Sequence, residues 1–125
     1  MANFVLEKID AVRGVQTFEK LIMDGKCLLD DFERHLEKEY RKELTSIYAN
    51  MNSVANLQSL PRTKYHFYDE GKNGVREFEF KTKHLRVYGI TKKNGKIIIL
   101  GGTKASQKAD TTKFRSIKIK YLSSL

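Results

Sequence analysis

The sequence contains one cysteine, Cys27, and one proline, Pro61. A single cysteine excludes an internal disulfide and a zinc site built from several thiolates. No apolar run approaches the roughly 18 residues that a membrane-spanning helix needs. The first ten residues, MANFVLEKID, lack the basic-then-apolar layout of a signal peptide. We therefore expect a cytoplasmic protein with no membrane association.

Several motifs that carry familiar chemistry are missing. The sequence has neither the phosphate-binding pattern GxxxxGK[ST] nor the dinucleotide-binding pattern GxGxxG. The three histidines, His35, His66 and His84, do not have the spacing of metal ligands, and no acidic cluster resembles a divalent-cation site. These absences predict no metal and no cofactor, and they argue against a metal-dependent nuclease.

Acidic residues are scarce in the second half of the chain. Residues 1–61 hold 8 Lys/Arg against 10 Asp/Glu, a net charge of −2, whereas residues 62–125 hold 16 against 5, a net charge of +11. Such an asymmetry indicates a nucleic acid or an anionic protein as the partner. The alternative is an ordinary solvated basic surface.

The 125 residues, 40% of them hydrophobic and 31% charged, predict a single folded domain over 1–125. Strand patterns occur at 3–9 and 16–23, which we expect to pair, and at 75–80, 85–90 and 97–100. Residues 62–68 are expected to be extended, with a turn-rich loop at 69–74. Asn94-Gly95 predicts a hairpin with a type I′ turn.

Apolar residues recur every three to four positions from Leu28 to Leu57, which indicates a helical face. This segment is either one long helix or two helices with a bend near Glu37–Arg41, and we expect it to end at Leu60-Pro61. The charges on its opposite face, Glu43 among them, are expected to be solvated. Asp110 is the predicted N-cap of a last helix over 111–122.

Cationic and aromatic side chains concentrate between Val75 and Lys108. Residues two apart in a strand share a face, so Arg86 and Tyr88 are expected to share one with His84. Lys81 and Lys83 then lie on the other face, unless a turn or bulge at Thr82–His84 re-aims them. A basic group held on a rigid sheet suggests contact with a phosphate backbone.

The order of these segments resembles the RelE/ParE superfamily of toxins from type II toxin–antitoxin systems, in particular its HigB-like branch. The resemblance rests on GVREFEF (74–80), RVY (86–88), KIIIL (96–100) and TKASQKAD (103–110). It covers about residues 17–122 and leaves 1–16 as an extra N-terminal strand. It implies an α+β fold: an antiparallel twisted sheet of four to six strands, packed against a long N-terminal helical segment, with a C-terminal helix.

The resemblance also implies a function. Such toxins are metal-independent endoribonucleases that cleave mRNA, often on the ribosome, and inhibit translation until a cognate antitoxin neutralises them. The 2′-hydroxyl attacks the adjacent phosphate and leaves a 2′,3′-cyclic end, so cationic side chains must stabilise the developing charge. The alternatives are a non-catalytic RNA- or protein-binding member of the same fold and a ParE-like gyrase inhibitor.

Within the resemblance, Arg86 is expected to stabilise the phosphate through its planar fork. Glu79 stands where many HigB-like sequences carry arginine, so it is a base, a structural ion-pair partner, or a sign of lost activity. We expect replacement of Arg86 by alanine to leave the fold intact. The predicted catalytic residues are Arg86, Lys81, Lys83, His84 and Glu79. The predicted RNA-binding residues are Arg76, Tyr88, Lys104, Gln107 and Lys108, with a place in the core as an equal alternative for Tyr88.

Overall fold

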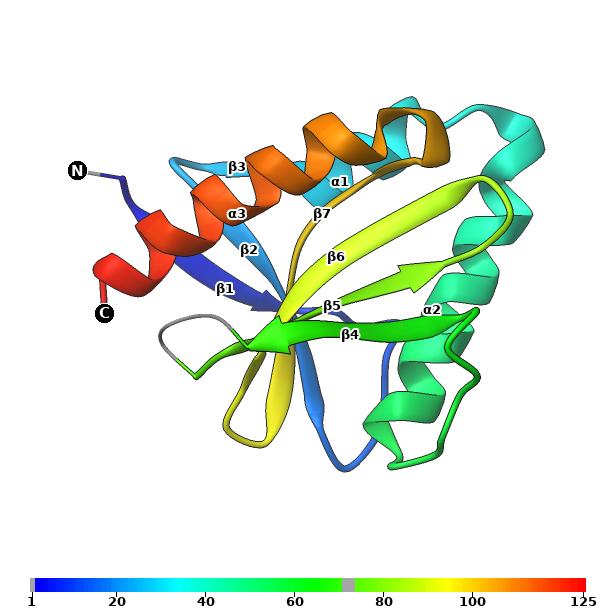
Figure 1. The fold of residues 1–125 in the computed structure, drawn as a ribbon, viewed down its shortest axis with the longest axis horizontal. Coiled ribbons are helices and arrows are strands. Elements are labelled where there is room, and N and C mark those ends of the chain that lie inside the picture. Colours follow the sequence, from blue (N-terminus) through cyan, green and yellow to red (C-terminus); the bar gives the residue numbers. More distant parts are fainter. Residues whose placement is uncertain (1, 71–73) are drawn as a thin grey trace.

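The computed structural model describes residues 2–70 and 74–125, which form an α+β fold of one sheet and three α-helices (Figure 1). The strands are β1 (Phe4–Lys8), β2 (Thr17–Met23), β3 (Lys26–Cys27), β4 (Tyr65–Glu70), β5 (Arg76–Lys81), β6 (Leu85–Lys92) and β7 (Gly95–Thr103). The helices are α1 (Leu28–His35), α2 (Arg41–Ala55) and α3 (Gln107–Ser123), and short 3-10 turns span Lys38–Tyr40 and Lys104–Ser106.

The sheet is mixed, which corrects the prediction of a purely antiparallel sheet of four to six strands. Its seven strands run in the order β1-β2-β7-β6-β5-β4, with β3 paired to the end of β2. All neighbouring pairs are antiparallel except β2 and β7, which are parallel from Thr17–Gly95 to Lys20–Ile98. A parallel pair needs a long crossover connection. Here the connection contains α1, α2 and four further strands, so no local sequence pattern predicts it.

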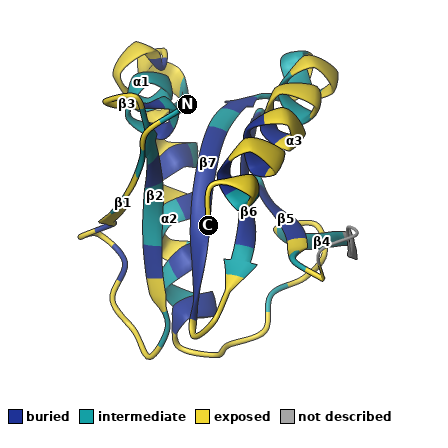
Figure 2. Ribbon diagram, turned by 90° about the vertical axis from the view of Figure 1, so that its left-hand side faces the viewer, coloured by how far each residue is buried: buried dark blue, intermediate teal, exposed yellow. Residues whose placement is uncertain are grey.

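Helices cover both faces of the sheet (Figure 2). One buried cluster joins α2 to the sheet through Ile47, Met51, Phe78, Phe80 and Val87. The other joins α3 to the opposite face and includes Tyr88, Ile97 and Phe114. Successive residues of a strand point to opposite faces. Alternate side chains of β5 and β6 therefore face the two different helical layers.

The helical segment is divided, so the two-helix alternative is confirmed. Leu36 follows α1 with extended backbone angles (φ −69°, ψ 133°) and is buried in the core, and a 3-10 turn then leads into α2. The segment ends earlier than Leu60-Pro61. Leu57 adopts a left-handed conformation (φ 64°), and the amide of Gln58 donates to the carbonyl oxygen of Ser53 (2.9 Å). This is the Schellman arrangement, which satisfies the last helical carbonyls.

The β6–β7 hairpin forms where the sequence predicts it, but its turn differs. Lys92 pairs with Gly95, so Lys93 and Asn94 make the turn, and of these only Asn94 has a positive φ (59°). Gly95 is already in the strand. A Cβ there would lie 2.3 Å from the carbonyl oxygen of Thr17, so close packing of β7 on β2 requires the glycine.

The last helix begins at Gln107, three residues before the predicted N-cap. Asp110 therefore lies within its first turn, where it accepts a hydrogen bond from the hydroxyl of Ser106 (2.6 Å). The loop predicted at 69–74 overlaps the end of β4, and residues 71–73 lie outside the described part of the chain. Across residues 2–70 and 74–125, no helix combines the length and the apolarity that crossing a bilayer requires.

Candidate functional site

A groove of about 960 Å³ lies between α2 and the turn that joins β5 to β6. Five of its lining residues are cationic: Lys64, Lys81, Lys83, Arg86 and Lys104. They come from three separate segments, namely the approach to β4, the β5–β6 hairpin and the 3-10 turn that follows β7. Glu43 is the one carboxylate among the described residues that line the groove. The site is therefore strongly electropositive, as an anion-binding surface must be.

The β5–β6 turn brings Lys81 and Arg86 onto the same face, which corrects the prediction that they lie on opposite faces. The two residues are direct partners in the antiparallel ladder. Residues directly opposite each other in such a ladder project to the same side. The turn contains Thr82, Lys83 and His84, and the amide of Thr82 donates to the carbonyl oxygen of Leu85 (3.1 Å). The turn thus changes the direction of these side chains, which is the alternative that the sequence left open for Thr82–His84.

Arg86 is held rigidly and is only 8% exposed. Its Nη1 donates to the carbonyl oxygens of Thr82 (2.6 Å) and Leu85 (2.8 Å), and these bonds clamp the β5–β6 turn. Its Nε is buried and has no hydrogen-bond partner within the described part of the chain. A buried, unsatisfied donor costs free energy. Because of this burial and these bonds, we now expect loss of the side chain to destabilise the fold, which the sequence alone does not predict.

Glu43 projects from α2 and ties that helix to the same turn. Its carboxylate accepts hydrogen bonds from the hydroxyl of Thr82 and from the amide of His84 (2.9 Å), and its Oε2 lies 2.6 Å from His84 Nδ1. Partial burial acts to raise the pKa of Glu43, but the bonds from Thr82 and His84 outweigh it and hold that pKa below its ordinary value. Glu43 is thus a structural anchor, not the solvated surface charge that the helical pattern predicts.

Glu43 should therefore stabilise the fold in a pH-dependent way. A group whose pKa is lowered by folding adds stability above its unfolded pKa and loses it as the pH falls through the folded pKa. We expect Glu43→Gln to lower the free energy of unfolding by about 1 kcal/mol at neutral pH, and we expect the deficit to shrink as the pH falls below the ordinary value of 4.5. Urea unfolding across that pH range measures this effect. Asp10→Asn, at an exposed position, is the control, and an equal deficit at all pH values would contradict the role of the charge.

His84 does not line the groove, but its side chain is hydrogen-bonded to Glu43, which does. Its ring lies against Tyr40, with 4.8 Å between ring centroids, and its side chain is 43% exposed. When Nδ1 donates to the carboxylate of Glu43, Nε2 is left as the proton acceptor. This is the usual arrangement by which a carboxylate orients a histidine for proton transfer.

Glu79 is buried and fully engaged. Its Oε2 accepts hydrogen bonds from the hydroxyl of Tyr68 (2.6 Å) and from Nε2 of Gln107 (3.3 Å), and its Oε1 lies 4.0 Å from Nζ of Lys81. At 3% exposure it does not line the groove. Of the three interpretations raised by the sequence, this geometry favours the structural ion-pair partner.

The other predicted RNA-binding residues do not gather at the groove, except Lys104. Tyr88 is fully buried and stacks on Phe114, with 5.6 Å between ring centroids, so its ring has no face free for a base. Burial raises the pKa of Tyr88 to about 12, which keeps its hydroxyl protonated. Gln107 is bound to Glu79, Lys108 is exposed on α3, and Arg76 lies at the opposite end of β5 from Lys81.

Sequence analysis did not identify Lys64 and Glu43 as site residues, although both line the groove. Lys64 is the last residue of the turn at 62–64, and its carbonyl oxygen accepts a hydrogen bond from the amide of Lys81 (3.0 Å), which places it beside Lys81. No local pattern distinguishes Lys64 from the other lysines of the basic half. Glu43 sits on the polar side of a helical repeat, where a solvated charge is the ordinary expectation.

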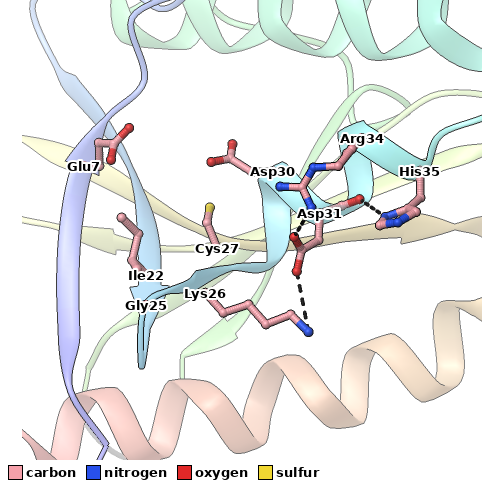
Figure 3. A pocket seen from close by; sticks show the side chains of 9 residues that line it. All are labelled: Glu7, Ile22, Gly25, Lys26, Cys27, Asp30, Asp31, Arg34 and His35. Atoms are coloured by element: carbon pink, nitrogen blue, oxygen red, sulfur yellow. Dashed lines mark hydrogen bonds and ion pairs between the residues drawn. The ribbon is translucent and has the colours of Figure 1, made fainter.

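A second hollow, of about 570 Å³, lies at the other end of the molecule between β1, β3 and α1 (Figure 3). Its carboxylates are paired with cations of the hollow or with Lys20 beside it. Asp31 contacts Arg34 (3.0 Å) and Lys26 (3.6 Å), and its carbonyl oxygen lies 2.8 Å from His35 Nδ1. Asp30 is paired with Lys20 (3.0 Å). With its charges neutralised internally, this hollow offers less to a charged ligand than the basic groove does.

Comparison with known proteins adds no assignment. Neither protein-family models, nor curated proteins, nor solved structures give a significant match to this chain. The function must therefore be argued from the groove itself.

Proposed function

We propose that the groove binds the sugar–phosphate backbone of RNA and that the protein is a toxin-type, metal-independent endoribonuclease acting on mRNA. The observation that carries the proposal is the convergence of five cationic side chains on one groove whose only described carboxylate is already hydrogen-bonded. Phosphate contacts by lysine and arginine supply most of the affinity of proteins for nucleic acid backbones. Three separate segments of the chain supply these side chains. A solvated basic surface gives no reason for them to converge on one groove.

The proposed reaction uses groups at or beside the groove. The 2′-hydroxyl loses its proton to Nε2 of His84, its oxygen attacks the adjacent phosphorus, and the bond from phosphorus to the 5′ oxygen breaks. One of the groove lysines gives a proton to that leaving oxygen. Arg86 and the remaining lysines stabilise the charge that develops on the phosphorane. Glu43 acts as a positioning residue, because it orients His84.

Cleavage is tested with purified protein and RNA in the presence of a chelator. We expect fragments that end in a 2′,3′-cyclic phosphate, and no cleavage of the same oligonucleotide made with 2′-deoxyribose, which lacks the nucleophile. RNA free in solution and mRNA bound to ribosomes should be tested side by side. Cleavage of the deoxy oligonucleotide, or cleavage that requires added magnesium, would contradict the proposed chemistry.

Binding should depend steeply on salt. For a single strand, the logarithm of the affinity falls with the logarithm of salt concentration by about 0.7 for each phosphate neutralised, so contact with four phosphates gives a slope of about −3. Replacing Lys81 or Lys104 with alanine should make the slope shallower by about 0.7. Lys113→Ala, at an exposed position on α3, is the charge-matched control. An unchanged slope in the groove variants would place the RNA elsewhere.

A second candidate function is non-catalytic binding of RNA at the same groove. It is favoured by the bonds of Arg86, whose Nη1 already donates to two backbone carbonyls. Under this alternative the variants change the salt slope, but no cyclic ends appear. Under either function, the proposed protein partner is an acidic antitoxin that neutralises the basic groove.

A further inference from the structure

A smaller hollow, of about 480 Å³, adjoins the groove along the segment between α2 and β4. Thr63 and Lys64 line the groove, whereas their neighbours in sequence, Arg62 and Tyr65, line the hollow. Consecutive residues of one segment thus form part of both walls. Lys64 is joined to Lys81 by the backbone hydrogen bond described above. A strand lying in the groove therefore needs only to continue past Lys64 to reach the hollow.

The hollow offers an aromatic and planar cationic surface. The guanidinium carbon of Arg76 sits 3.9 Å from the ring centroid of Phe67, so its plane is backed by an aromatic ring. Arg76 is an exposed residue. Unpaired bases stack on aromatic rings and on arginine guanidinium planes in sequence-tolerant binding sites. This arrangement is suited to the face of a base and not to a phosphate alone.

Polar groups complete the hollow. Nη2 of Arg62 lies 3.3 Å from Nδ1 of His66 at its rim. Among the described residues, no carboxylate lines the hollow. Its net charge is therefore positive, like that of the groove, so a polyanion is favoured across both. Tyr65 and Phe67 of the hollow pack against the core beneath α2, and residues of α2 also line the groove.

We infer that this hollow binds an unpaired nucleobase of the same RNA strand whose phosphates occupy the groove, so that the substrate is single-stranded RNA. The inference rests on the proposed function. The length of β5 gives the distance between the groove and the hollow: the five steps from Lys81 to Arg76 span about 17 Å at about 3.4 Å per residue. That length accommodates a few nucleotides of an extended strand. A base within a duplex is stacked and paired, and it cannot enter.

The test uses a short RNA oligonucleotide that carries 2-aminopurine, whose fluorescence falls when it stacks. We expect the wild-type protein to quench it and to bind the single strand at least tenfold more tightly than the duplex formed with its complement. Arg76→Lys keeps the positive charge but removes the planar guanidinium, and Arg76→Ala removes both. Each should weaken binding of the single strand about tenfold, and Arg76→Lys should leave the salt slope unchanged. Lys113→Ala is again the control.

The outcomes separate this inference from the proposed function. If Lys81→Ala weakens binding while both Arg76 variants bind and quench like wild type, or if duplex binds as well as single strand, the groove stands and the base-binding hollow is overturned. If neither Lys81→Ala nor Lys104→Ala affects binding, both the proposed function and the base-binding hollow are overturned. An oligonucleotide with an abasic site in place of 2-aminopurine should bind equally to wild type and Arg76→Lys, because that variant keeps the charge. A loss with the abasic strand as well would assign Arg76 to phosphate binding and overturn the stacking role.

Discussion

Replacing Arg86 with alanine should reduce RNA cleavage by about 10²–10³-fold, the usual effect of losing one preorganised contact to a developing oxyanion. Arg86 lines the groove and is fixed by two hydrogen bonds to carbonyl oxygens, so its position needs no further ordering when substrate binds. Arg86→Lys should recover little of the rate, because a single ammonium nitrogen cannot bond the two carbonyl oxygens of the turn and also present a second nitrogen to the phosphate, as a guanidinium can. Rates are measured at saturating RNA, so that binding and chemistry are separated.

The same substitution should also destabilise the protein, by about 1.5–3 kcal/mol, because the clamp on the β5–β6 turn is lost. The rate must therefore be corrected for the folded fraction measured by urea unfolding at the assay temperature. Thr82→Ala is a useful comparison, since Thr82 bonds Glu43 at the same turn through its side chain and carries no charge. Cleavage by folded Arg86→Ala at the wild-type rate would remove Arg86 from the proposed mechanism and leave it a structural residue.

Replacing Glu77 with alanine should cost about 3–5 kcal/mol of folding free energy, because it leaves a buried charge without its partner. Glu77 and Lys118 are both 6% exposed, and Nζ of Lys118 donates to Oε2 of Glu77 (3.0 Å). Nε of Arg115 donates to Oε1 (3.1 Å), so two cations of α3 converge on one carboxylate of β5. The loss is measured by urea unfolding.

The double variant Glu77→Leu with Lys118→Met is the control for this prediction. Replacing a buried ion pair by apolar side chains of similar size is often neutral or stabilising, so the double variant should regain most of the stability that Glu77→Ala loses. Glu77 faces α3 and lies outside the groove. Cleavage per folded molecule should therefore be unchanged. A double variant as unstable as Glu77→Ala would show that the pair itself stabilises the fold.

The elements of the fold were largely predictable from the sequence because their signals are local. Alternating apolar residues mark β5 and β6, a continuous apolar run at 97–100 marks β7, and an apolar repeat every three to four residues marks α1 and α2. The hairpin at Asn94 and the pairing of β1 with β2 also follow from short-range patterns. Of the ten predicted site residues, Lys81, Lys83, Arg86 and Lys104 line one groove, and the other six do not line it.

Errors arose wherever a residue's role depends on a distant partner. The parallel pairing of β2 with β7 joins segments about eighty positions apart, and helix periodicity cannot reveal it. Glu43 looked solvated because its partners, Thr82 and His84, come from another element. Tyr88 looked available because only α3, which covers it, makes it part of the core.

By itself, the sequence determined the kinds of elements, their order, and the concentration of positive charge in residues 62–125, since composition and periodicity are properties of neighbouring residues. Only the tertiary structure decided which charges meet. It buried Glu79 against Tyr68, clamped Arg86 to its own turn, and brought Lys64 and Glu43 to the groove. The physical reason is that burial and charge pairing depend on distances in space, which long-range packing sets and sequence spacing does not encode.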